Sequence, residues 1–282
     1  MPLQAMGTLF VVATPIGNLA DLSPRARSVL AEVAVVAAED TRHTGMMLKH
    51  FGIDKPLISV HEHNEATRVA QVLERLRAGD SVALVSDAGT PLISDPGFDI
   101  VRAAIEQGTR VIPLPGPCAA IAALSVAGLP TDRFVFEGFL PAKAGPRRDR
   151  LAAMSHDSRT LIFYEAPHRL DDTLSDVAAT LGERRVAVAR EMTKQFECVY
   201  YGTTSALALR AQQDKDMKRG ELVIIVAGAE EKSQALSDAD TVLRILLADL
   251  APAQAAKLAA RLTGAKREDL YQRAVALSEQ KR

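Results

Sequence analysis

The chain has 282 residues, which is too long for one small module and suits two domains of roughly 100–200 residues each. Hydrophobic residues make up 48% and charged residues 24%, a balance that excludes disorder, collagen and coiled coil. The 34 Lys+Arg against 35 Asp+Glu exclude a globally basic nucleic-acid coat, although a local basic patch fits a neutral total. With 8 Phe, 4 Tyr and no Trp, a carbohydrate cleft or a multi-base stacking platform is disfavoured.

Short β-branched runs alternate with helical periods over the first 230 residues of the chain. Ser23 followed by Pro24 predicts the start of a helix, and residues 65–78 carry apolar side chains at helical spacing. This alternation predicts βαβ units and a mainly parallel sheet covered on both faces. The predicted strands are Thr8–Ala13, Val33–Ala37, Leu57–Val60, Ser81–Val85, Arg110–Leu114, Phe134–Phe136, Thr160–Tyr164, Arg185–Ala189 and Leu222–Ala227.

The pattern divides the chain into three parts. Residues 1–128 carry strand–helix units that end in a small-residue helix, and they predict a mainly parallel N-terminal α/β domain. Residues 129–232 space their strands less regularly, which predicts a second α/β domain with a mixed sheet. Residues 233–282 show only helical periods. Within them, Ala253–Leu262 and Arg267–Leu277 resemble a helix-turn-helix hairpin, although a plain helical cap has the same pattern.

Neither the start of the chain nor its two cysteines points to secretion or a membrane. We expect no signal peptide, and Leu9–Ala13 is far shorter than the about 18–20 apolar residues of a membrane span. Cys118 and Cys198 lie far apart, which favours reduced, packed thiols. The sequence therefore predicts a cytoplasmic protein.

Common nucleotide, hydrolase and metal motifs are absent from the sequence. No GxxxxGK[ST], HExxH, GxSxG or CxxC occurs, and no GxGxxG follows the first strand. His61 and His63 would share one face of a strand, but no third ligand is identifiable. A solvated or hydrogen-bonded pair is favoured there, and we predict no metal.

Three loops at the carboxyl ends of predicted strands combine Gly, Pro and small residues. They are ATPIGNL at 13–19, SDAGTPLISDPG at 86–97 and LPGPCAA at 114–120. Ligands of open α/β sheets bind at these strand ends, and such loops let a ligand approach the backbone closely. None of the three contains Lys or Arg, which disfavours phosphates and suits an adenosine with an amino-acid tail. A small-molecule pocket is favoured over three ordinary tight turns.

The ordered set of motifs around these loops resembles a known family. The chain is similar to the tetrapyrrole-methylase-like (class III) S-adenosylmethionine-dependent methyltransferases and, within them, to the group that methylates ribosomal small-subunit RNA. The motifs are VATPIGNL, AAEDTRHT, SDAGTPLISDPG, PLPGPCAA, FEGFLP, FYEAPHR and REMTK, and with the C-terminal segment the resemblance covers essentially the whole chain.

The resemblance implies a homodimeric enzyme of two α/β domains with S-adenosyl-L-methionine as the methyl donor in the cleft between them. It also implies 2′-O-methylation of a cytidine ribose in the decoding region of 16S rRNA, within the 30S subunit. The first loop, ATPIGN, departs from the GxGxGD form of the precorrin enzymes. Individual ligand roles are therefore not carried over to that loop as a whole.

The candidate donor site lies in the Gly/Pro-rich loops. Asp87 ends a strand, where a carboxylate can meet ribose or ammonium, although it can equally cap amides of its own loop. Asp95 suits a helix N-cap, and free amides at the start of the helix at Ala119 can meet a carboxylate. The full set of predicted donor-site residues is Pro15, Asp87, Ala88, Gly89, Ile93, Ser94, Ala119, Ala120, Ala166 and Ala227.

Two polar clusters at strand ends are candidates for handling the substrate hydroxyl, a weak nucleophile. Lys194 or Arg42 would lower its pKa or hold a phosphate, while Glu191 or Asp40 would take its proton. Internal salt bridges at an interface have the same pattern, so that alternative stays open. Further candidates, in the motif YEAPHR, are Glu165 and His168.

The segment Pro141–Arg150 holds four basic residues and one acid, which predicts an exposed basic loop. RNA affinity depends on phosphate contacts, so this loop is the predicted RNA ligand, against the alternative of a merely solvated loop. Two other functions compete: methylation of a small tetrapyrrole-type molecule, and donor and RNA binding without chemistry. The predicted RNA-binding residues are Lys143, Arg147, Arg148 and Arg150.

Overall fold

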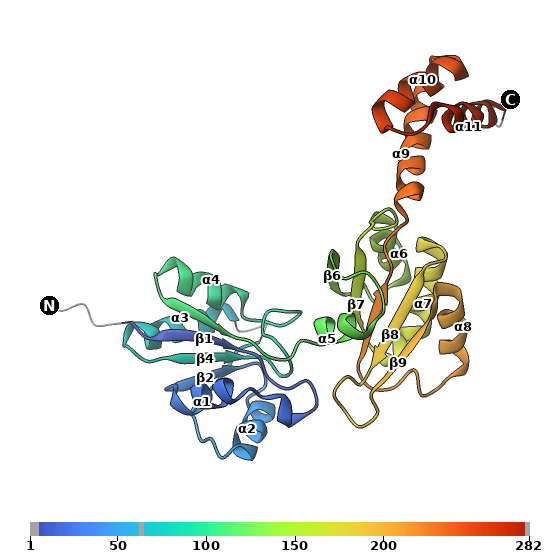
Figure 1. Cartoon of the computed structure of the whole chain (residues 1–282). Coiled ribbons are helices and arrows are strands. Elements are labelled where there is room, and N and C mark those ends of the chain that lie inside the picture. The colour runs from blue at the N-terminus through green and yellow to red at the C-terminus, as the bar shows by residue number, and fades with distance from the viewer. Residues whose placement is uncertain (1–5, 62–64, 280–282) are drawn as a thin grey trace.

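A computed structural model describes residues 6–61 and 65–279 (Figure 1). Two α/β units lie side by side, and a C-terminal helical unit projects from the second one. This architecture confirms the predicted fold class, including the parallel first sheet, the mixed second sheet and the C-terminal helices.

The first sheet is entirely parallel. Its strands are β1 (Thr8–Val12), β2 (Val35–Ala38), β3 (Leu57–Ser59), β4 (Val82–Val85) and β5 (Arg110–Leu114), in the order β3-β2-β4-β1-β5. Side chains of β2 and β4 are buried throughout because helices cover both faces. One apolar cluster joins the sheet to α1 (Pro24–Glu32) and α2 (Thr41–His50), and another joins it to α3 (Glu65–Arg77) and α4 (Phe98–Glu106).

The second sheet is mixed, with the order β6-β7-β10-β8-β9, and β6–β7 is its parallel pair. The strands are β6 (Phe134–Phe139), β7 (Thr160–Glu165), β8 (Arg185–Arg190), β9 (Cys198–Thr203) and β10 (Leu222–Val226). One face carries α6 (Ala144–Ala153), α7 (Leu170–Leu181) and α8 (Thr204–Gln213). The other face carries α5 (Ala119–Val126), whose small side chains pack on β7, β8 and β10. The helix that follows the first sheet thus packs on the second.

Two segments differ from the sequence prediction. Strand β9, at the edge of the second sheet, has no predicted counterpart. The expected exposed basic loop at 141–150 is wrong, because residues 144–153 form α6. Pro146 falls in the first turn of that helix, where its missing N–H needs no partner. Leu151 lies on the buried face of α6.

The C-terminal unit has its own core. Helices α9 (Glu231–Leu246), α10 (Pro252–Thr263) and α11 (Arg267–Glu279) bury small side chains against one another, as predicted for helical periods without strands. Pro252 begins α10, and Gly264, with φ 73°, ends it in the left-handed conformation. Figure 1 shows these helices standing away from the second sheet. Among the described residues, no helix is long and apolar enough to cross a membrane.

Candidate functional site

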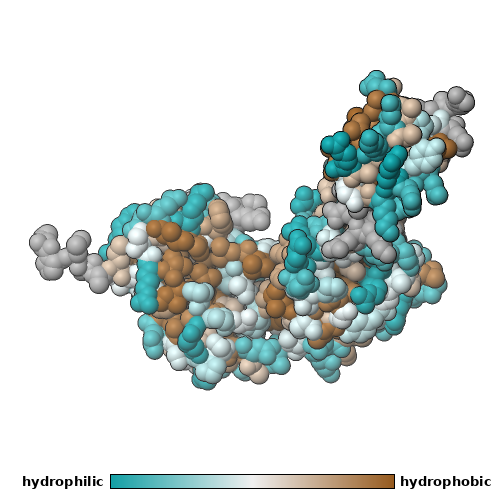
Figure 2. Space-filling model, turned by 45° about the horizontal axis from the view of Figure 1, so that its top comes forward, coloured by the Kyte–Doolittle hydropathy of each residue, from teal (hydrophilic) through white to brown (hydrophobic). Residues whose placement is uncertain are grey.

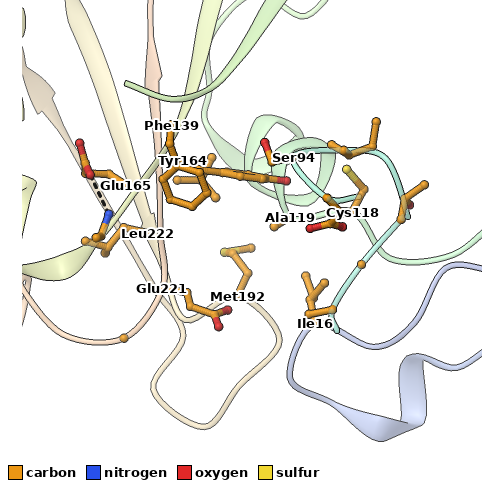
Figure 3. Close-up of a pocket in the computed structure, with 18 of the residues that line it drawn as sticks. Ile16, Ser94, Cys118, Ala119, Phe139, Tyr164, Glu165, Met192, Glu221 and Leu222 are labelled. Carbon is orange, nitrogen blue, oxygen red and sulfur yellow. Dashed lines mark hydrogen bonds between the residues drawn. The ribbon is translucent and has the colours of Figure 1, made fainter. Parts of the chain in front are cut away.

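A cavity of about 390 Å³ lies between the two α/β units, at the carboxyl ends of the first sheet's strands. Figure 3 shows residues of both units facing one another across it. Six predicted donor-site residues line the cavity, namely Ala88, Gly89, Ile93, Ser94, Ala119 and Ala166. The predicted cleft between the domains therefore exists, and the Gly/Pro-rich loops form one of its walls.

Hydrogen bonds hold these loops in a defined shape. Thr14 and Gly89 exchange backbone hydrogen bonds of 2.8 and 3.1 Å, which join the first loop to the second. Thr90 Oγ1 donates to the carbonyl of Pro117 at 2.9 Å, which joins the second loop to the third. Gly89 has a φ of 89°, so a side chain there would be strained. This wall is fixed before any ligand binds.

Asp87 and Asp95 have exchanged the roles expected of them. Asp87 lies outside the cavity lining, and its Oδ1 accepts the backbone N–H of Asp40 at 2.9 Å, so it caps amides at the strand ends. The N-cap of α4 is Gly97, so the expectation that Asp95 caps this helix is wrong. Asp95 lines the cavity instead, where burial above all raises its pKa to about 6. The nearby carboxylates of Glu39 and Asp87 act in the same direction.

The other predicted donor-site residues lie beside the cavity. Pro15 is buried next to Ile16, which does line the cavity. The N–H of Ala227 donates to the carbonyl of Arg185 at 2.9 Å and continues the second sheet. The N–H of Ala120, expected to meet the donor's carboxylate, instead donates to the hydroxyl of Tyr164 at 3.2 Å.

Asp40 and Arg42 form the internal ion pair that was the alternative for their cluster. Asp40 caps the start of α2 by accepting the N–H of Arg42, and its Oδ2 lies 2.8 Å from Nη2 of the same residue. Arg42 holds the pKa of the Asp40 carboxyl well below its usual value. The Arg42 side chain is 88% exposed, and neither residue lines the cavity.

Lys194 and Glu191 meet at the edge of the cavity. The Lys194 Nζ lies 2.9 Å from Glu191 Oε1 and 3.1 Å from Oε2 of Glu221, a residue that lines the cavity. Burial lowers the pKa of the Lys194 ammonium, but the two carboxylates outweigh that effect and hold it above its usual value. The cavity edge thus carries a cation held by two carboxylates.

Strained backbone is confined to two loops that border the cavity. Among the described residues, positive φ outside glycine occurs at Leu92 (73°), Ser94 (69°), Glu191 (52°) and Thr193 (68°). Each loop holds two of these residues and also contributes side chains to the lining. Such conformations cost about 1–3 kcal/mol each and gather where function requires a fixed geometry. The strain marks this cavity as the candidate site.

The second domain supplies lining residues that the site prediction omitted. Tyr164 extends toward Ser94 and Cys118 (Figure 3), and its ring packs edge-on against Phe136 and Phe139 at 4.9 and 5.7 Å. The motifs FEGFLP, FYEAPHR and REMTK contained a usable signal, because they hold three of these residues. The omitted residues include Phe139, Tyr164, Met192 and Glu221.

Glu165 and His168 have structural positions. Glu165 is buried, and its carboxylate accepts hydrogen bonds from the Thr173 hydroxyl at 2.5 Å and the Ala166 N–H at 2.8 Å. Arg169 completes this anchor with an ion pair of 3.1 Å. His168 is exposed on the short 3₁₀ turn that follows β7. Glu165 lines the cavity with its carboxylate already engaged by these three groups, whereas His168 is not among the lining residues.

The predicted RNA-binding residues do not form one group. Arg147 is only 4% exposed, and its Nε lies 2.6 Å from Oδ2 of Asp176, so it fastens α6 to α7 and is not available to RNA. Arg148 contacts the other oxygen of Asp176 at 2.6 Å, but its side chain is 63% exposed. Arg150 pairs with Glu137 and remains half exposed, and Lys143 is exposed at the N-cap of α6.

The described part of the chain holds no group of three or more His, Cys, Asp or Glu side chains placed for a metal ion. His61 is described, while His63 lies outside the described residues. Cys118 and Cys198 are both free, as expected, and Cys118 lines the cavity.

The fold, with two α/β domains and a cavity between them, agrees with the family to which the sequence matches. Residues 8–208 match the family model of the tetrapyrrole (corrin/porphyrin) methylases, and residues 233–278 match the RsmI C-terminal HTH domain. The chain belongs to the tetrapyrrole methylase family. As the motifs predicted, it is a methyltransferase with S-adenosylmethionine as its methyl donor.

The sequence relatives share one printed name, ribosomal RNA small subunit methyltransferase I. The protein of Xylella fastidiosa (strain Temecula1) is 55% identical over 94% of this chain and 98% of its own length. That of Pseudomonas aeruginosa is 55% identical over 96% and 98%, and that of Escherichia coli O157:H7 is 51% identical over 96% of both. The expected resemblance to this group is confirmed.

Solved structures support the fold. The methyltransferase CobJ matches with a TM-score of 0.59 at 20% identity, over 79% of this chain and 95% of that one. Uroporphyrin-III-C-methyltransferase from Thermus thermophilus matches with a TM-score of 0.56 at 21% identity, over 78% and 94%. These matches extend the shared architecture across both α/β domains.

Proposed function

We propose that the chain transfers a methyl group from S-adenosylmethionine to the 2′-hydroxyl of a cytidine ribose in the decoding region of 16S rRNA. The observation that carries the proposal is the cavity between the domains, with Lys194 held at its edge by Glu191 and Glu221. The names of the relatives support ribosomal RNA as the substrate. The ribose position follows the resemblance of the motifs.

The lining suits a positively charged donor that carries no phosphate. No Lys or Arg side chain is among the lining residues, whereas Asp95, Glu165 and Glu221 are. A carboxylate attracts the ammonium and the sulfonium of the donor, and Tyr164 and Phe139 offer aromatic surface to an adenine. The preformed loops around Gly89 allow backbone contacts with the ligand.

Lys194 is the group that we assign to the substrate hydroxyl. When bound, the donor supplies a methyl group on a cationic sulfur. The chain has to hold the nucleophilic oxygen at about 3–3.5 Å from that methyl, in line with the sulfur. The Lys194 ammonium would donate a hydrogen bond to this oxygen and lower its pKa, and Glu191 would accept the proton. The roles first considered for Asp40 and Arg42 are not retained, because these two residues pair with each other.

Three further parts of the proposal concern the surroundings. The exposed cations Lys143, Arg148 and Arg150 would contact RNA phosphates. A homodimer would cover apolar surface, because Ile121 and Val126 of α5 are exposed and Figure 2 shows hydrophobic residues gathered on the first unit. The substrate would be the 30S subunit in the cytoplasm.

The test is a radiolabelled methyl-transfer assay. Purified protein and labelled donor are offered unmethylated 30S subunits, free 16S rRNA and a tetrapyrrole precursor in parallel. We expect label in 16S rRNA, recovered as an alkali-resistant dinucleotide because a 2′-O-methyl group blocks cleavage at that ribose. Label only in the tetrapyrrole would overturn the proposal in favour of the chemistry named for the solved structures. Donor binding without any label would indicate a non-catalytic protein.

A further inference from the structure

Helix α10 presents two cations on its exposed side. Its buried side consists of Ala255, Ala256 and Ala259, which pack against the neighbouring helices. Lys257 and Arg261 are four residues apart, so they lie one turn apart on the same face, and both are exposed. The small alanines bring the helices close together, while the long cationic side chains reach into solvent.

Two more cations follow directly after the turn. Gly264 reverses the chain in the left-handed conformation, and Lys266 and Arg267 are exposed at the start of α11. We call Lys257, Arg261, Lys266 and Arg267 the basic turn. Within 239–278, it contributes four of the six basic side chains.

The cations of the basic turn have no ion-pair partner among the described residues. Arg273, on the same helix pair, differs, because its Nε and Nη2 donate to the two carboxylate oxygens of Asp240 at 2.6 and 2.5 Å and tie α11 to α9. Arg273 thus stabilises the packing of the helical unit, whereas the cations of the basic turn form no ion pair that holds the unit together. Leu262, which is 70% exposed, lies among the latter.

We propose that the basic turn docks the enzyme on the phosphate backbone of its RNA substrate, away from the ribose that is methylated. This inference rests on the proposed function. Unpaired cations gathered around one exposed turn complement a polyanion, and phosphate contacts dominate RNA affinity. Glu268 and Asp269 lie in the first turn of α11, so the phosphates are assigned to side-chain cations and not to the helix end.

The position of the helical unit gives this contact a specific consequence. The unit projects from the second domain (Figure 1), and hydrophilic residues lie beside exposed hydrophobic ones on the face in Figure 2. The basic turn and the cavity therefore contact different parts of one RNA. A short oligonucleotide around the target ribose will be a poor substrate, whereas an extended RNA will benefit from both contacts.

The test compares two sets of three substitutions in the full chain. The first is Arg261→Gln, Lys266→Gln and Arg267→Gln. The control is Lys49→Gln, Lys55→Gln and Arg110→Gln, which removes the same charge from the first α/β domain. RNA binding is measured by fluorescence anisotropy over a range of salt concentrations, donor binding by calorimetry, and methylation by the labelled assay with a long and a short RNA.

We expect the first set to weaken long-RNA binding at least about tenfold and to reduce the salt slope by about 2–3, since each phosphate contact contributes about 0.7–0.9. Donor affinity and kcat at saturating RNA should stay at the wild-type value, and the control should match the wild type throughout. Unchanged RNA affinity would overturn the proposal. Weaker binding of 30S subunits with unchanged binding of naked rRNA would also overturn it and indicate a ribosomal protein as the partner.

These outcomes separate the docking site from the proposed function. Wild-type protein that binds long RNA through the basic turn without methylating it would leave the docking site standing and refute the proposed reaction. If the first set of substitutions leaves methylation of 16S rRNA unchanged at limiting RNA, the docking site is refuted and the proposed reaction stands.

Discussion

Gly17 and Lys194 touch across the boundary between the two α/β domains. A Cβ built on Gly17 would lie 2.3 Å from Cγ of Lys194, and Gly17 has a φ of 147°, which few other residues adopt. The loop after β1 therefore leaves space for the side chain whose Nζ lies between Glu191 and Glu221. A second close approach of this kind joins Gly138 of β6 to Ser94.

The first prediction concerns Gly17→Ala. The added methyl group would displace the Lys194 side chain, so we expect kcat to fall at least about tenfold while the protein remains folded. Gly145→Ala is the matched control, because its Cβ would meet nothing within 4 Å and it lies in a helix. Single-turnover methylation and circular dichroism measure the two effects. An active Gly17→Ala enzyme would show that the Lys194 position is not needed.

Lys194→Met tests the assigned cation directly. Removing the ammonium while keeping the length of the side chain should lower kcat about 100-fold, within the range of general acid–base effects. Donor affinity should change little, since Lys194 is not among the lining residues. Lys215→Met, at an exposed position, is the control. Loss of donor binding with unchanged kcat at saturation would mean that Lys194 only supports the pocket.

Asp95→Asn should have a pH-dependent effect on stability. Burial raises the pKa of the Asp95 carboxyl to about 6, so the folded protein retains this proton up to about pH 6, whereas the ordinary pKa of the carboxyl is 3.8. The wild-type protein therefore loses stability as pH rises between these values, and the amide removes the loss. Discounted for solvent screening, the gain above pH 6 is about 1 kcal/mol, or about 2–4 °C in Tm. Thermal melts at pH 4 and pH 8 measure it, and an equal shift at both would contradict this origin.

Substitutions of Arg147 and Arg148 should have different effects, the first on stability and the second on RNA affinity. Arg147→Ala leaves the buried Asp176 carboxylate without its interior partner, and we expect a loss of about 3 kcal/mol of unfolding free energy. Arg148→Ala removes an exposed partner and should cost less than about 1 kcal/mol, but it should weaken RNA binding. Urea denaturation and RNA titration distinguish the two. Similar effects of both substitutions on stability would contradict the different burial of their side chains.

The sequence predicted most of the sheets because strands covered on both faces are apolar throughout, as the parallel β4 and the antiparallel β10 are. Strand β9 at the sheet edge was missed, since its side chains are only partly buried and its apolar pattern is weak. The basic segment at 144–153 can be helical although it contains a proline. Pro146 falls in the first turn of the helix, where proline is tolerated. Local composition alone did not reveal the buried partner of Arg147, which lies on α7.

The site was partly predictable for a similar reason. Loops at the ends of parallel strands must meet at one edge of the sheet, so Gly89 and Ala119 were found. The roles of Asp87 and Asp95 depend on how the loop folds between them, and that path includes left-handed Leu92 and Ser94. Such conformations arise from tertiary contacts, and the residue types do not reveal them.

Helix α5 carries the chain from the first sheet onto the second, and the cavity lies where the two cores meet without merging. Neither core alone sets the width of the cavity. A bound ligand would thus contact both domains and couple two units that each have their own core. Filling the cavity should convert two independent melting events into a single one, so donor occupancy would determine how cooperatively the whole enzyme unfolds.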